Sequence, residues 1–412
     1  MRVTIYKGCP KGIVFAEPSK SECHRLLVSY MLSKDDGVLE NVKTSDDIKA
    51  TLNCINAYSR NYTQDDETII FKKESSDNLI RNEAVPIFNC NESGSTLRFF
   101  IPIALTKYEH VIFTCTKKLG ERGISIYEDL FSKQNIKIIK SDLDNNKVQF
   151  EFIGKLKADE FFLRGDVSSQ FVTGLLFALP LLEGDSKIII TTELQSKNYC
   201  DMTLNVLDRF GITINRENNV FSIKGNQQYS AKQKVQAVEG DYSNASFLAA
   251  FNYFGGNIEI KGLNEESLQG DKIYNEYFKT LYLEDSPTLN IENCIDLGPV
   301  LFAFATISKG GHFIGCSRLK IKESNRIEAM KEELAKMGAE IIVNDDDVII
   351  KKTKLHYPTS SFDSHNDHRI AMALSLFSTQ FDIQINNAQA VNKSYKDYFK
   401  VLNSLGLEIK CD

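Results

Sequence analysis

Lysine and arginine side chains recur where a short polar segment runs into an apolar stretch, as in SKSECHRLLVSYML and SGSTLRFFIPIAL. Such junctions are typical of helix N-termini, where unpaired backbone N–H groups and a partial positive charge favour phosphate or carboxylate. Any one of these cations alone would be interpreted as a solvated surface charge. Together they predict a site for one or more ligands with several negative charges. The cations concerned are Lys20, Arg25, Arg98, Arg122, Lys322, Arg326, Arg369 and Lys393.

Two carboxylates beside these cations could move protons. Asp296 lies in the segment IDLGP, and Glu323 lies in KESNR. A positioned carboxylate suits both general acid and general base catalysis. From the residues alone, Asp296 could equally cap a helix, and Glu323 could favour a helix dipole from the first turn. His365 and His368 are separated by two residues, but no third ligand of suitable type stands nearby in the sequence, so no metal site is predicted.

The overall composition limits the possible classes of protein. The 412 residues are 42% hydrophobic and 25% charged, which is typical of a globular protein of about two or three domains. A formal net charge of -6 argues against general nucleic-acid binding. Without an apolar run of about 18 residues, neither a membrane span nor export is predicted. The nine cysteines form no CxxC pair and are interpreted as reduced thiols, so we expect a cytoplasmic protein.

The elements that position these residues recur along the chain. A polar segment leads into an apolar, helix-like stretch at six places, spaced by about 55 to 75 residues. Helices as uniformly apolar as GLLFALPLL must be buried, so we expect them inside, covered by sheets. Any single junction could be an ordinary capped core helix. The stretches start near Ser21, Ser95, Ser168, Ser243, Leu297 and His368.

A second pattern lies between these stretches, in which an amphipathic helix leads into a β-hairpin. It is clearest in RIEAMKEELAKMGAEIIVNDDDVIIKK, where Gly338 suits a left-handed helix cap and residues 344–347 form a turn between two strands. Each repeat unit is therefore predicted to be mixed α/β. The Gln- and Lys-rich stretch of residues 225–236 is the best candidate for an internal linker, with three units on each side. The sequence thus predicts two similar domains with a cleft between them.

Nine motifs, in order along the chain, carry a family resemblance. They are PSKSECHR, ESGSTLR, GERG, VSSQF, QSKNY, VEGDYSNAS, KIKESNRIEAMKEELAKMGAE, NDHRIAMALSL and VNKSYKDYF. The sequence resembles the 5-enolpyruvylshikimate-3-phosphate synthase family over essentially its whole length. The resemblance implies an α/β (α+β) fold of two domains, each of three βαβαββ repeats with buried helices and outer sheets, an inside-out α/β barrel. It also implies that the first strand belongs to the second domain, giving domains at 15–236 and at 1–14 plus 237–412, with the active site in the cleft between them.

The resemblance also implies roles for residues at the matching positions. It implies that Lys20, Asp296 and Glu323 are catalytic, Glu323 giving a proton to the methylene carbon of phosphoenolpyruvate and Asp296 accepting the hydroxyl proton. The residues implied to bind shikimate 3-phosphate are Lys20, Ser21, Arg25, Ser168, Ser169, Ser196, Asp296 and Lys322. The residues implied to bind phosphoenolpyruvate are Lys20, Gly94, Arg122, Gln170, Arg326, Arg369 and Lys393. No metal or organic cofactor is required, and a monomer is expected.

Two other functions stay open at this point. The related transferase that acts on UDP-N-acetylglucosamine would share the fold, and its loop commonly carries a reactive cysteine. Cys115 precedes Arg122 by seven residues, which is not the expected offset, so we interpret it as a buried thiol. A non-catalytic repeat protein that binds phosphate metabolites is the second alternative. The chain departs from the family motifs at His24, Glu92, Phe99 and Arg318, and Pro18-Ser19 replaces Gly-Ser in the first motif.

Overall fold

The computed structural model describes residues 1–72 and 84–412. The chain forms two compact units, which are described separately. Unit 1 comprises Met1–Glu17 and Glu239–Asp412, and unit 2 comprises Pro18–Val238. The limits of these units lie within a few residues of the limits implied by the family resemblance. The predicted location of the active site, in a cleft between domains, stays a prediction.

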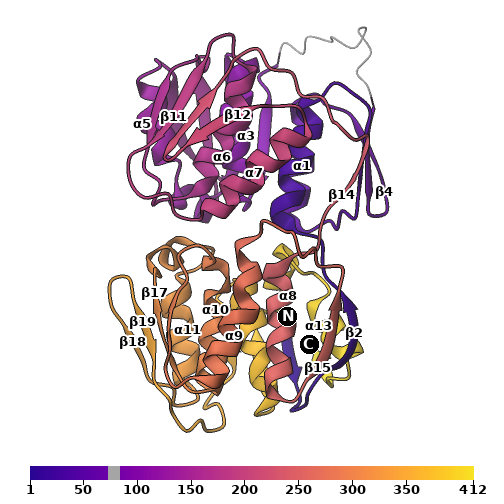
Figure 1. The fold of residues 1–412 in the computed structure, drawn as a ribbon, viewed down its shortest axis with the longest axis vertical. Helices are drawn as coiled ribbons and strands as arrows, with labels where there is room; N and C mark the ends of the chain where they lie inside the picture. Colours follow the sequence, from indigo (N-terminus) through magenta and orange to yellow (C-terminus); the bar gives the residue numbers. More distant parts are fainter. Residues whose placement is uncertain (73–83) are drawn as a thin grey trace. The chain divides into compact units, whose positions relative to one another are not determined.

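Unit 2 contains sheets of four strands covering helices, as far as its described residues go (Figure 1). The sheets, each in spatial order, are β14 (Val235–Ala237), β3 (Gly37–Glu40), β5 (Thr68–Phe71) and β4 (Tyr62–Asp65); β6 (Ile87–Asn91), β7 (His110–Thr116), β9 (Lys147–Ile153) and β8 (Lys137–Leu143); and β10 (Glu160–Leu163), β11 (Ser186–Ile190), β13 (Val220–Ile223) and β12 (Ile214–Glu217). The helices are α1 (Lys20–Leu32), α2 (Asp46–Ala57), α3 (Gly94–Lys107), α4 (Lys117–Arg122), α5 (Ser125–Ser132), α6 (Ser169–Ala178), η1 (Leu179–Leu181) and α7 (Lys197–Arg209).

Unit 1 has the same kinds of element. Its sheets are β20 (Phe362–Asp363), β21 (Ile383–Asn386), β1 (Arg2–Ile5) and β22 (Ile409–Cys411); β16 (Thr288–Asn290), β17 (Gly311–Ile314), β19 (Val348–Ile350) and β18 (Ile341–Val343); and the pair β15 (Asn257–Lys261) and β2 (Lys11–Phe15). The helices are α8 (Tyr242–Ala249), η2 (Ala250–Phe254), η3 (Gly270–Ile273), α9 (Tyr274–Leu283), η4 (Ile295–Leu297), α10 (Gly298–Ile307), η5 (Ser317–Ile321), α11 (Arg326–Ala335), α12 (His368–Ser375), η6 (Leu376–Thr379), η7 (Ala388–Lys393) and α13 (Tyr398–Ser404).

Four of these sheets share one pattern of strand pairing. In the sheets that begin with β6, β10, β14 and β16, the first two strands run parallel and the last two form an antiparallel hairpin. In the sheets that begin with β6, β10 and β16, the crossover between the parallel strands contains α3, α6 or α10, consistent with the need of parallel strands for a helical connection. In the sheet that begins with β20, β1 lies between β21 and β22 and is antiparallel to both. The fold is therefore mixed α/β.

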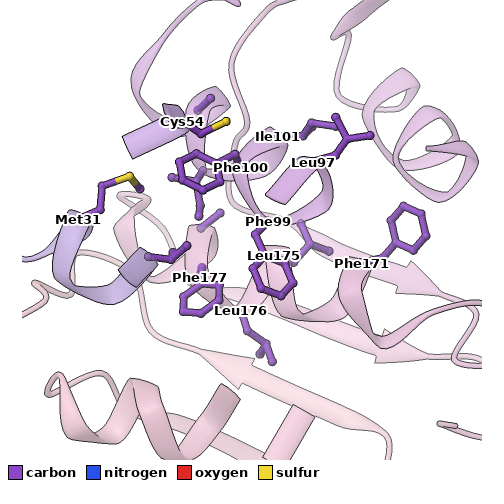
Figure 2. Packing of buried hydrophobic residues seen from close by; sticks show 14 of the residues in the cluster. Met31, Cys54, Leu97, Phe99, Phe100, Ile101, Phe171, Leu175, Leu176 and Phe177 are labelled. Carbon is purple, nitrogen blue, oxygen red and sulfur yellow. The ribbon is translucent and has the colours of Figure 1, made fainter. Parts of the chain in front are cut away.

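The helices that link the parallel strands are buried because they are apolar on every side. In α10 and in α6 nine of ten residues are buried, and in α3 eleven of fourteen are buried. Figure 2 shows the core of unit 2, where Phe99 of α3 lies near Leu175 and Phe177 of α6. The six predicted helix starts are confirmed, since α1, α3, α6, α8, α10 and α12 each begin within one residue of the predicted position.

The predicted helix-to-hairpin pattern is confirmed as well. Gly338, after α11, has a φ of 81°, the left-handed conformation that a glycine adopts without steric cost. The N–H of Asn344 donates to the carbonyl of Asp347 over 2.9 Å, which closes the turn between β18 and β19. The same order of helix and hairpin occurs for α5 with β8 and β9, and for α7 with β12 and β13.

The predicted linker is not a free segment. Residues 225–236 belong to unit 2, where the side chain of Tyr229 is buried and its hydroxyl donates to the carbonyl of Phe177 over 2.7 Å. Strand β14 pairs in parallel with β3. The polar composition of residues 225–236 predicted a linker, but packing against α6 removes the apolar ring of Tyr229 from water.

Among the described residues, none of the helices is both long and apolar enough for a membrane span.

Candidate functional site

The N-termini of the buried helices are capped by side chains, and these caps place the candidate residues. Ser93 accepts from the N–H of Thr96 at the start of α3, and Ser168 accepts from the N–H of Gln170 at the start of α6, each over 3.3 Å. In unit 1, Asp367 caps α12 through the N–H of Arg369 over 2.9 Å. A small polar residue at the cap is preferred because its oxygen pairs an N–H that the helix leaves free. The candidate residues therefore lie in the first turns of these helices.

A group of polar side chains in unit 2 surrounds Gly94. A Cβ atom at Gly94 would lie 3.0 Å from Arg98 Nη1, 3.4 Å from Gln170 Oε1 and 3.7 Å from Arg122 Nη2. Arg98 Nη1 also donates to Gln170 Oε1 over 2.5 Å, and Gln170 Nε2 donates to Ser95 Oγ over 2.9 Å. We call Gly94, Arg98, Arg122 and Gln170 the Gly94 cluster. Three of its members were predicted to bind phosphoenolpyruvate, and Arg98 joins them.

Helix α1 carries the other predicted cations of unit 2. Lys20 Nζ lies 2.8 Å from Asp47 Oδ2 on α2, with both side chains 18% exposed. Arg25 is buried and donates to the carbonyl oxygens of Ser21 and Tyr199 over 2.7 Å and 2.9 Å. Burial lowers the pKa of Arg25 to about 10, so the guanidinium stays charged at neutral pH. Lys20 is thus the more accessible of the two cations for a ligand.

Three of the four serines predicted to bind shikimate 3-phosphate lie at the starts of α6 and α7. Ser168 and Ser169 are the cap and the first residue of α6, and Ser169 is 8% exposed. Ser196 precedes α7 in a left-handed conformation with a φ of 53° and is 2% exposed. Left-handed geometry is costly for a residue other than glycine and is found where the surroundings require it. Helix α7 also carries Tyr199, whose carbonyl accepts from Arg25, so Ser196 and Arg25 lie in one region of unit 2.

The cations and carboxylates predicted in unit 1 form one buried ionic network around Arg326. Its guanidinium donates to Asp296 Oδ1 over 2.8 Å, to Glu323 Oε2 over 2.6 Å and to Asp367 Oδ2 over 2.8 Å. Arg326 is 1% exposed. Such a planar, forked donor set holds several carboxylates in fixed directions. We call Asp296, Lys322, Glu323, Arg326, Asp367 and Arg369 the Arg326 cluster.

Asp296 is the point where three cations of this cluster meet. Besides Arg326, Lys322 Nζ lies 3.6 Å from Oδ1 and Arg369 Nη2 lies 3.3 Å from Oδ2. Burial alone would raise the pKa of Asp296, but the charges of Arg369, Lys322 and Arg326 outweigh it and hold this pKa well below its usual range. Burial lowers the pKa of Lys322 to about 8. Asp296 is therefore ionised at neutral pH, as an acceptor of a proton must be.

Other residues near Asp296 were not in the predicted set. Burial raises the pKa of Asp271 to about 7, and the negative charge of Asp296 adds to this shift. Arg369 donates to the hydroxyl of Ser243, the residue that follows the first residue of α8. Ser243 was signalled only as the start of a predicted helix in the motif VEGDYSNAS, and nothing in the sequence signalled Asp271.

Lys393, which was predicted to bind phosphoenolpyruvate, donates from Nζ to the carbonyl of Asn366 over 3.1 Å, beside the start of α12.

The histidine that was considered for a metal site is part of an ion-pair network. His365 Nε2 lies 2.9 Å from Glu333 Oε1, and Glu333 Oε2 accepts from Lys336 over 2.7 Å and from the N–H of Asp363 over 2.9 Å. Glu332, Glu333 and His365 offer ligand atoms within 4.8 Å of one another. Both oxygens of Glu333 thus already have protein partners, and the network joins α11 to the loop before α12.

The positions that depart from the family motifs are structurally explained in three cases. Phe99 is buried in the core of unit 2, where its ring lies 5.6 Å from that of Phe177 (Figure 2). Glu92 pairs with Lys118 over 3.7 Å, and Arg318 donates to the carbonyl of Glu292.

All nine cysteines are free thiols. Cys115 is buried as predicted, and burial raises its pKa to about 12.

The sequence-predicted residues therefore fall into two groups, one in each unit. Unit 2 holds the Gly94 cluster with Lys20, Ser21, Arg25, Ser168, Ser169 and Ser196, and unit 1 holds the Arg326 cluster with Lys393. The first group offers guanidinium, ammonium, amide and hydroxyl donors for anions and hydroxyl groups. The second combines cations with carboxylates that can accept or give protons.

Comparisons with known proteins point to one family. The sequence model for EPSP synthase (3-phosphoshikimate 1-carboxyvinyltransferase) matches residues 8–402. The 3-phosphoshikimate 1-carboxyvinyltransferase of Clostridium kluyveri is 40% identical, with 97% of this chain and 96% of that protein covered. The protein of the same name from Clostridium perfringens is 38% identical, with 98% of each chain covered.

Solved structures agree on the fold. Two structures of EPSP synthase from Acinetobacter baumannii superpose with TM-scores of 0.78 and 0.79 at 19% and 18% sequence identity, and each match covers both chains completely. Because these identities are low, this likeness supports the architecture alone. The match of the family model over almost the whole sequence and the identity to full-length relatives lead to one conclusion: the chain belongs to the EPSP synthase (3-phosphoshikimate 1-carboxyvinyltransferase) family.

Proposed function

We propose that this protein transfers the enolpyruvyl group of phosphoenolpyruvate to the 5-hydroxyl of shikimate 3-phosphate, releasing inorganic phosphate. The family match over residues 8–402 supports the reaction. The single structural observation that carries it is the convergence of Arg98, Arg122 and Gln170 on Gly94, the first residue of α3, whose lack of a side chain lets them approach the backbone closely. Fixed guanidinium groups at a helix N-terminus suit a small, multiply charged anion such as phosphoenolpyruvate.

Phosphoenolpyruvate would be held by groups from both units. Arg122, Gln170 and the backbone at Gly94 would bind one of its anionic ends. Arg326, Arg369 and Lys393 would bind the other, and Lys20 would reach the phosphate as a point charge. Three of these cations are balanced by carboxylates, Lys20 by Asp47 and both Arg326 and Arg369 by Asp296. Binding therefore exchanges protein carboxylates for ligand oxygens, which limits the cost of keeping cations buried.

Shikimate 3-phosphate would use the helix starts of unit 2. The hydroxyls of Ser168, Ser169 and Ser196 would bind the ring hydroxyls and the phosphate, with Ser21 and Arg25 beside them. Lys322 and Asp296 of unit 1 would contact the reacting hydroxyl. The N-termini of α1 and α6 add the partial positive charge that favours a phosphate group.

The proposed chemistry has two steps, and its protons balance. Glu323 gives a proton to the methylene carbon of phosphoenolpyruvate, while Asp296 accepts the proton of the 5-hydroxyl as its oxygen adds to the adjacent carbon. In the second step a methyl proton returns to Glu323, and phosphate leaves with the proton held by Asp296. The ionised state of Asp296, kept by Arg369, Lys322 and Arg326, fits the accepting role. No step requires a metal or an organic cofactor.

The finer architecture forms part of the same proposal. We propose that each unit consists of three βαβαββ repeats with buried helices and outer sheets, the shared topology of the sheets at β6, β10 and β16 being its strongest support. Because the proposed roles are divided between the two clusters, catalysis requires both units. A cytoplasmic location and a monomeric state remain predictions of the sequence.

The test is phosphate release by the purified protein supplied with phosphoenolpyruvate. Release with shikimate 3-phosphate is expected, and it should be lost in Lys20→Met and Arg122→Ala. Matched controls are Lys224→Met and Arg164→Ala, whose side chains are 82% and 63% exposed in surface ion pairs and should leave the rate unchanged. Release that requires UDP-N-acetylglucosamine instead would replace the proposal by the rival activity. Absence of release with either acceptor from a folded sample would contradict both.

The rival activity is not favoured by the structure of Cys115. The thiol is fully buried, and its pKa of about 12 keeps it protonated, whereas a reactive cysteine must be an accessible thiolate. Cys115→Ser should therefore retain phosphate release with shikimate 3-phosphate. Loss of activity in this variant, at unchanged stability, would reopen the alternative.

A further inference from the structure

A chain of hydrogen bonds crosses three helices of unit 2 beneath the candidate site. His24 Nδ1 on α1 lies 2.7 Å from Thr51 Oγ1 on α2, and Thr51 Oγ1 lies 2.8 Å from Thr96 Oγ1 on α3. The hydroxyl of Thr96 donates to Ser93 Oγ over 2.7 Å. All four side chains are at most 1% exposed. We call this chain of groups the His24 relay.

The direction of the relay follows from counting protons. Thr96 has one hydroxyl proton, which it donates to Ser93, so its oxygen can only accept from Thr51. The single proton of Thr51 is used in that bond, so Thr51 in turn accepts from His24 Nδ1. His24 is therefore a donor through Nδ1–H. His24, Thr51 and Thr96 thus each donate a hydrogen bond in the direction of Ser93.

The surroundings of His24 fix the same protonation state. Burial lowers the pKa of His24 well below its usual value, and the nearby charges of Lys20 and Arg25 lower it further, so the ring is neutral. Nε2 has no hydrogen-bond partner among the described residues. The ring meets Phe99 edge to face with centroids 6.5 Å apart. A proton on Nε2 would lack an acceptor there, whereas Nδ1–H has one in Thr51.

The relay ends at the structure that shapes the Gly94 cluster. Ser93 Oγ accepts both from the hydroxyl of Thr96 and from its N–H, which makes Ser93 the cap of α3, and Gly94 is the next residue. The other end of the relay lies one helical turn after Lys20. Lys20 pairs with Asp47 and His24 pairs with Thr51, so two contacts, one turn apart on each helix, join α1 to α2.

We propose that His24 is a positioning residue for enolpyruvyl transfer, which acts through Thr51 and Thr96 to hold the start of α3 at a fixed place relative to Lys20. Without this tie, Gly94 and Arg98 could shift against Lys20, although the same anion must reach all of them. Displacements of well under 1 Å matter for such a site, since productive geometry accounts for much of catalysis. The inference depends on the proposed function for its kinetic readout, but its structural part does not.

The middle of the relay offers the cleanest test. Thr51→Val keeps the volume and removes the hydroxyl, and Thr51→Ser keeps the hydroxyl. The matched control is Thr306→Val in α10 of unit 1, which removes a hydroxyl that is similarly buried and donates to the carbonyl of Phe302 over 2.8 Å. We expect Thr51→Val to raise the KM for phosphoenolpyruvate about fivefold to tenfold, with a smaller change for shikimate 3-phosphate. Thr51→Ser should restore it.

Two outcomes of the kinetic experiment would overturn the inference. One is a Thr51→Val enzyme with both KM values unchanged, and the other is an equal loss in Thr306→Val. A wild-type protein that neither turns over nor binds phosphoenolpyruvate in calorimetry would instead contradict the proposed function, and with it the positioning role. Failure of the function and failure of the relay are thus distinguished by the wild-type protein.

The direction of the relay is tested without activity. The measurement is nitrogen NMR of protein with 15N-labelled histidine, in which the His24 signals are assigned by their loss in His24→Gln. It should show that Nδ1 is protonated and Nε2 is not. The two signals should not titrate between pH 6 and pH 8, and the Nδ1 signal should shift in Thr51→Val but not in Thr306→Val. A protonated Nε2, or an imidazolium at neutral pH, would contradict the relay.

Discussion

Arg326 donates from Nε to Oδ2 of Asp367 over 2.8 Å, and neither side chain is more than 1% exposed. This pair orients the guanidinium so that its two other nitrogens face Asp296 and Glu323. Asp367 also caps α12 and accepts from the hydroxyl of Ser324 over 3.1 Å. Asp367, which has no part in the proposed proton transfers, therefore fixes the two carboxylates that carry them out.

Removing the charge of Asp367 should destabilise unit 1. Asp367→Asn retains a cap for α12 but leaves Arg326 without its most buried partner, and breaking a buried ion pair costs about 3 kcal/mol. Urea unfolding should show this loss in the transition of unit 1. The control is Asp185→Asn, whose exposed pair with Lys224 should leave the unfolding transition almost unchanged. Equal effects of the two substitutions would contradict the prediction.

A methyl group at Gly94 should weaken phosphoenolpyruvate binding selectively. In Gly94→Ala the new Cβ would lie 3.0 Å from Arg98 Nη1 and 3.4 Å from Gln170 Oε1, which is tight enough to displace either side chain. Steady-state kinetics should show a KM for phosphoenolpyruvate raised about tenfold. The KM for shikimate 3-phosphate should change far less, and a similar rise in both would argue against the assignment of this cluster.

Activity should fall as the pH rises through about 8. Lys322 has a pKa of about 8 because burial disfavours its charged form, and the proposed site needs that charge beside Asp296. The profile of kcat/KM should therefore have a basic limb near this value. In Lys322→Arg the charge persists to higher pH, so the limb should move upward even if the rate drops. A basic limb that stays in place would exclude Lys322 as its cause.

The pair of His365 and Glu333 should make stability depend on pH. The hydrogen bond to Glu333 raises the pKa of His365, although partial burial opposes the shift. A raised pKa means that the contribution is fully present below the unfolded value of about 6.5 and is lost as the pH rises through the folded value. His365→Gln should cost about 1 kcal/mol at pH 6 and less at pH 8 in urea unfolding. A cost that grows with pH would contradict this sign.

The contact between α3 and α6 should not tolerate a larger residue at Gly174. A Cβ there would collide with the carbonyl oxygen of Arg98 and the hydroxyl of Tyr127, and it would lie 3.1 Å from Pro102. Gly174→Ala should destabilise unit 2 by about 1–3 kcal/mol. Because Arg98 would be displaced with its backbone, phosphoenolpyruvate binding should weaken as well. Unchanged thermal unfolding of unit 2 would show that the helices can separate without cost.

Local patterns were sufficient to predict the helices and most of the cations. A cap such as Ser93 followed by an apolar run marks a helix start within a few residues, so α3 and its five counterparts begin where expected. Arg326 and Arg369 were found in the same way, because they lie in first turns. The assignment of their roles required the family motifs.

Partners that are distant in sequence could not be predicted in this way. Asp47 meets Lys20, and Thr51 meets His24, across 27 residues and between different helices. Asp271 lies near Asp296 because η3 and η4 both pack against α8. Residues 225–236 were predicted as a linker from their polarity, whereas the burial of Tyr229 depends on the surface of α6, which no local pattern describes.

The position of β1 constrains the order of events during synthesis. Residues 2–5 pair with residues 383–386 and 409–411, which leave the ribosome nearly four hundred residues later. Unit 2 is one uninterrupted stretch of chain and can fold while translation continues, as domains generally do. The first strand therefore stays unpaired until the other strands of its sheet have been synthesised. Nascent chains halted before residue 383 should therefore contain a protease-resistant unit 2 attached to an N-terminal segment that is still cleaved.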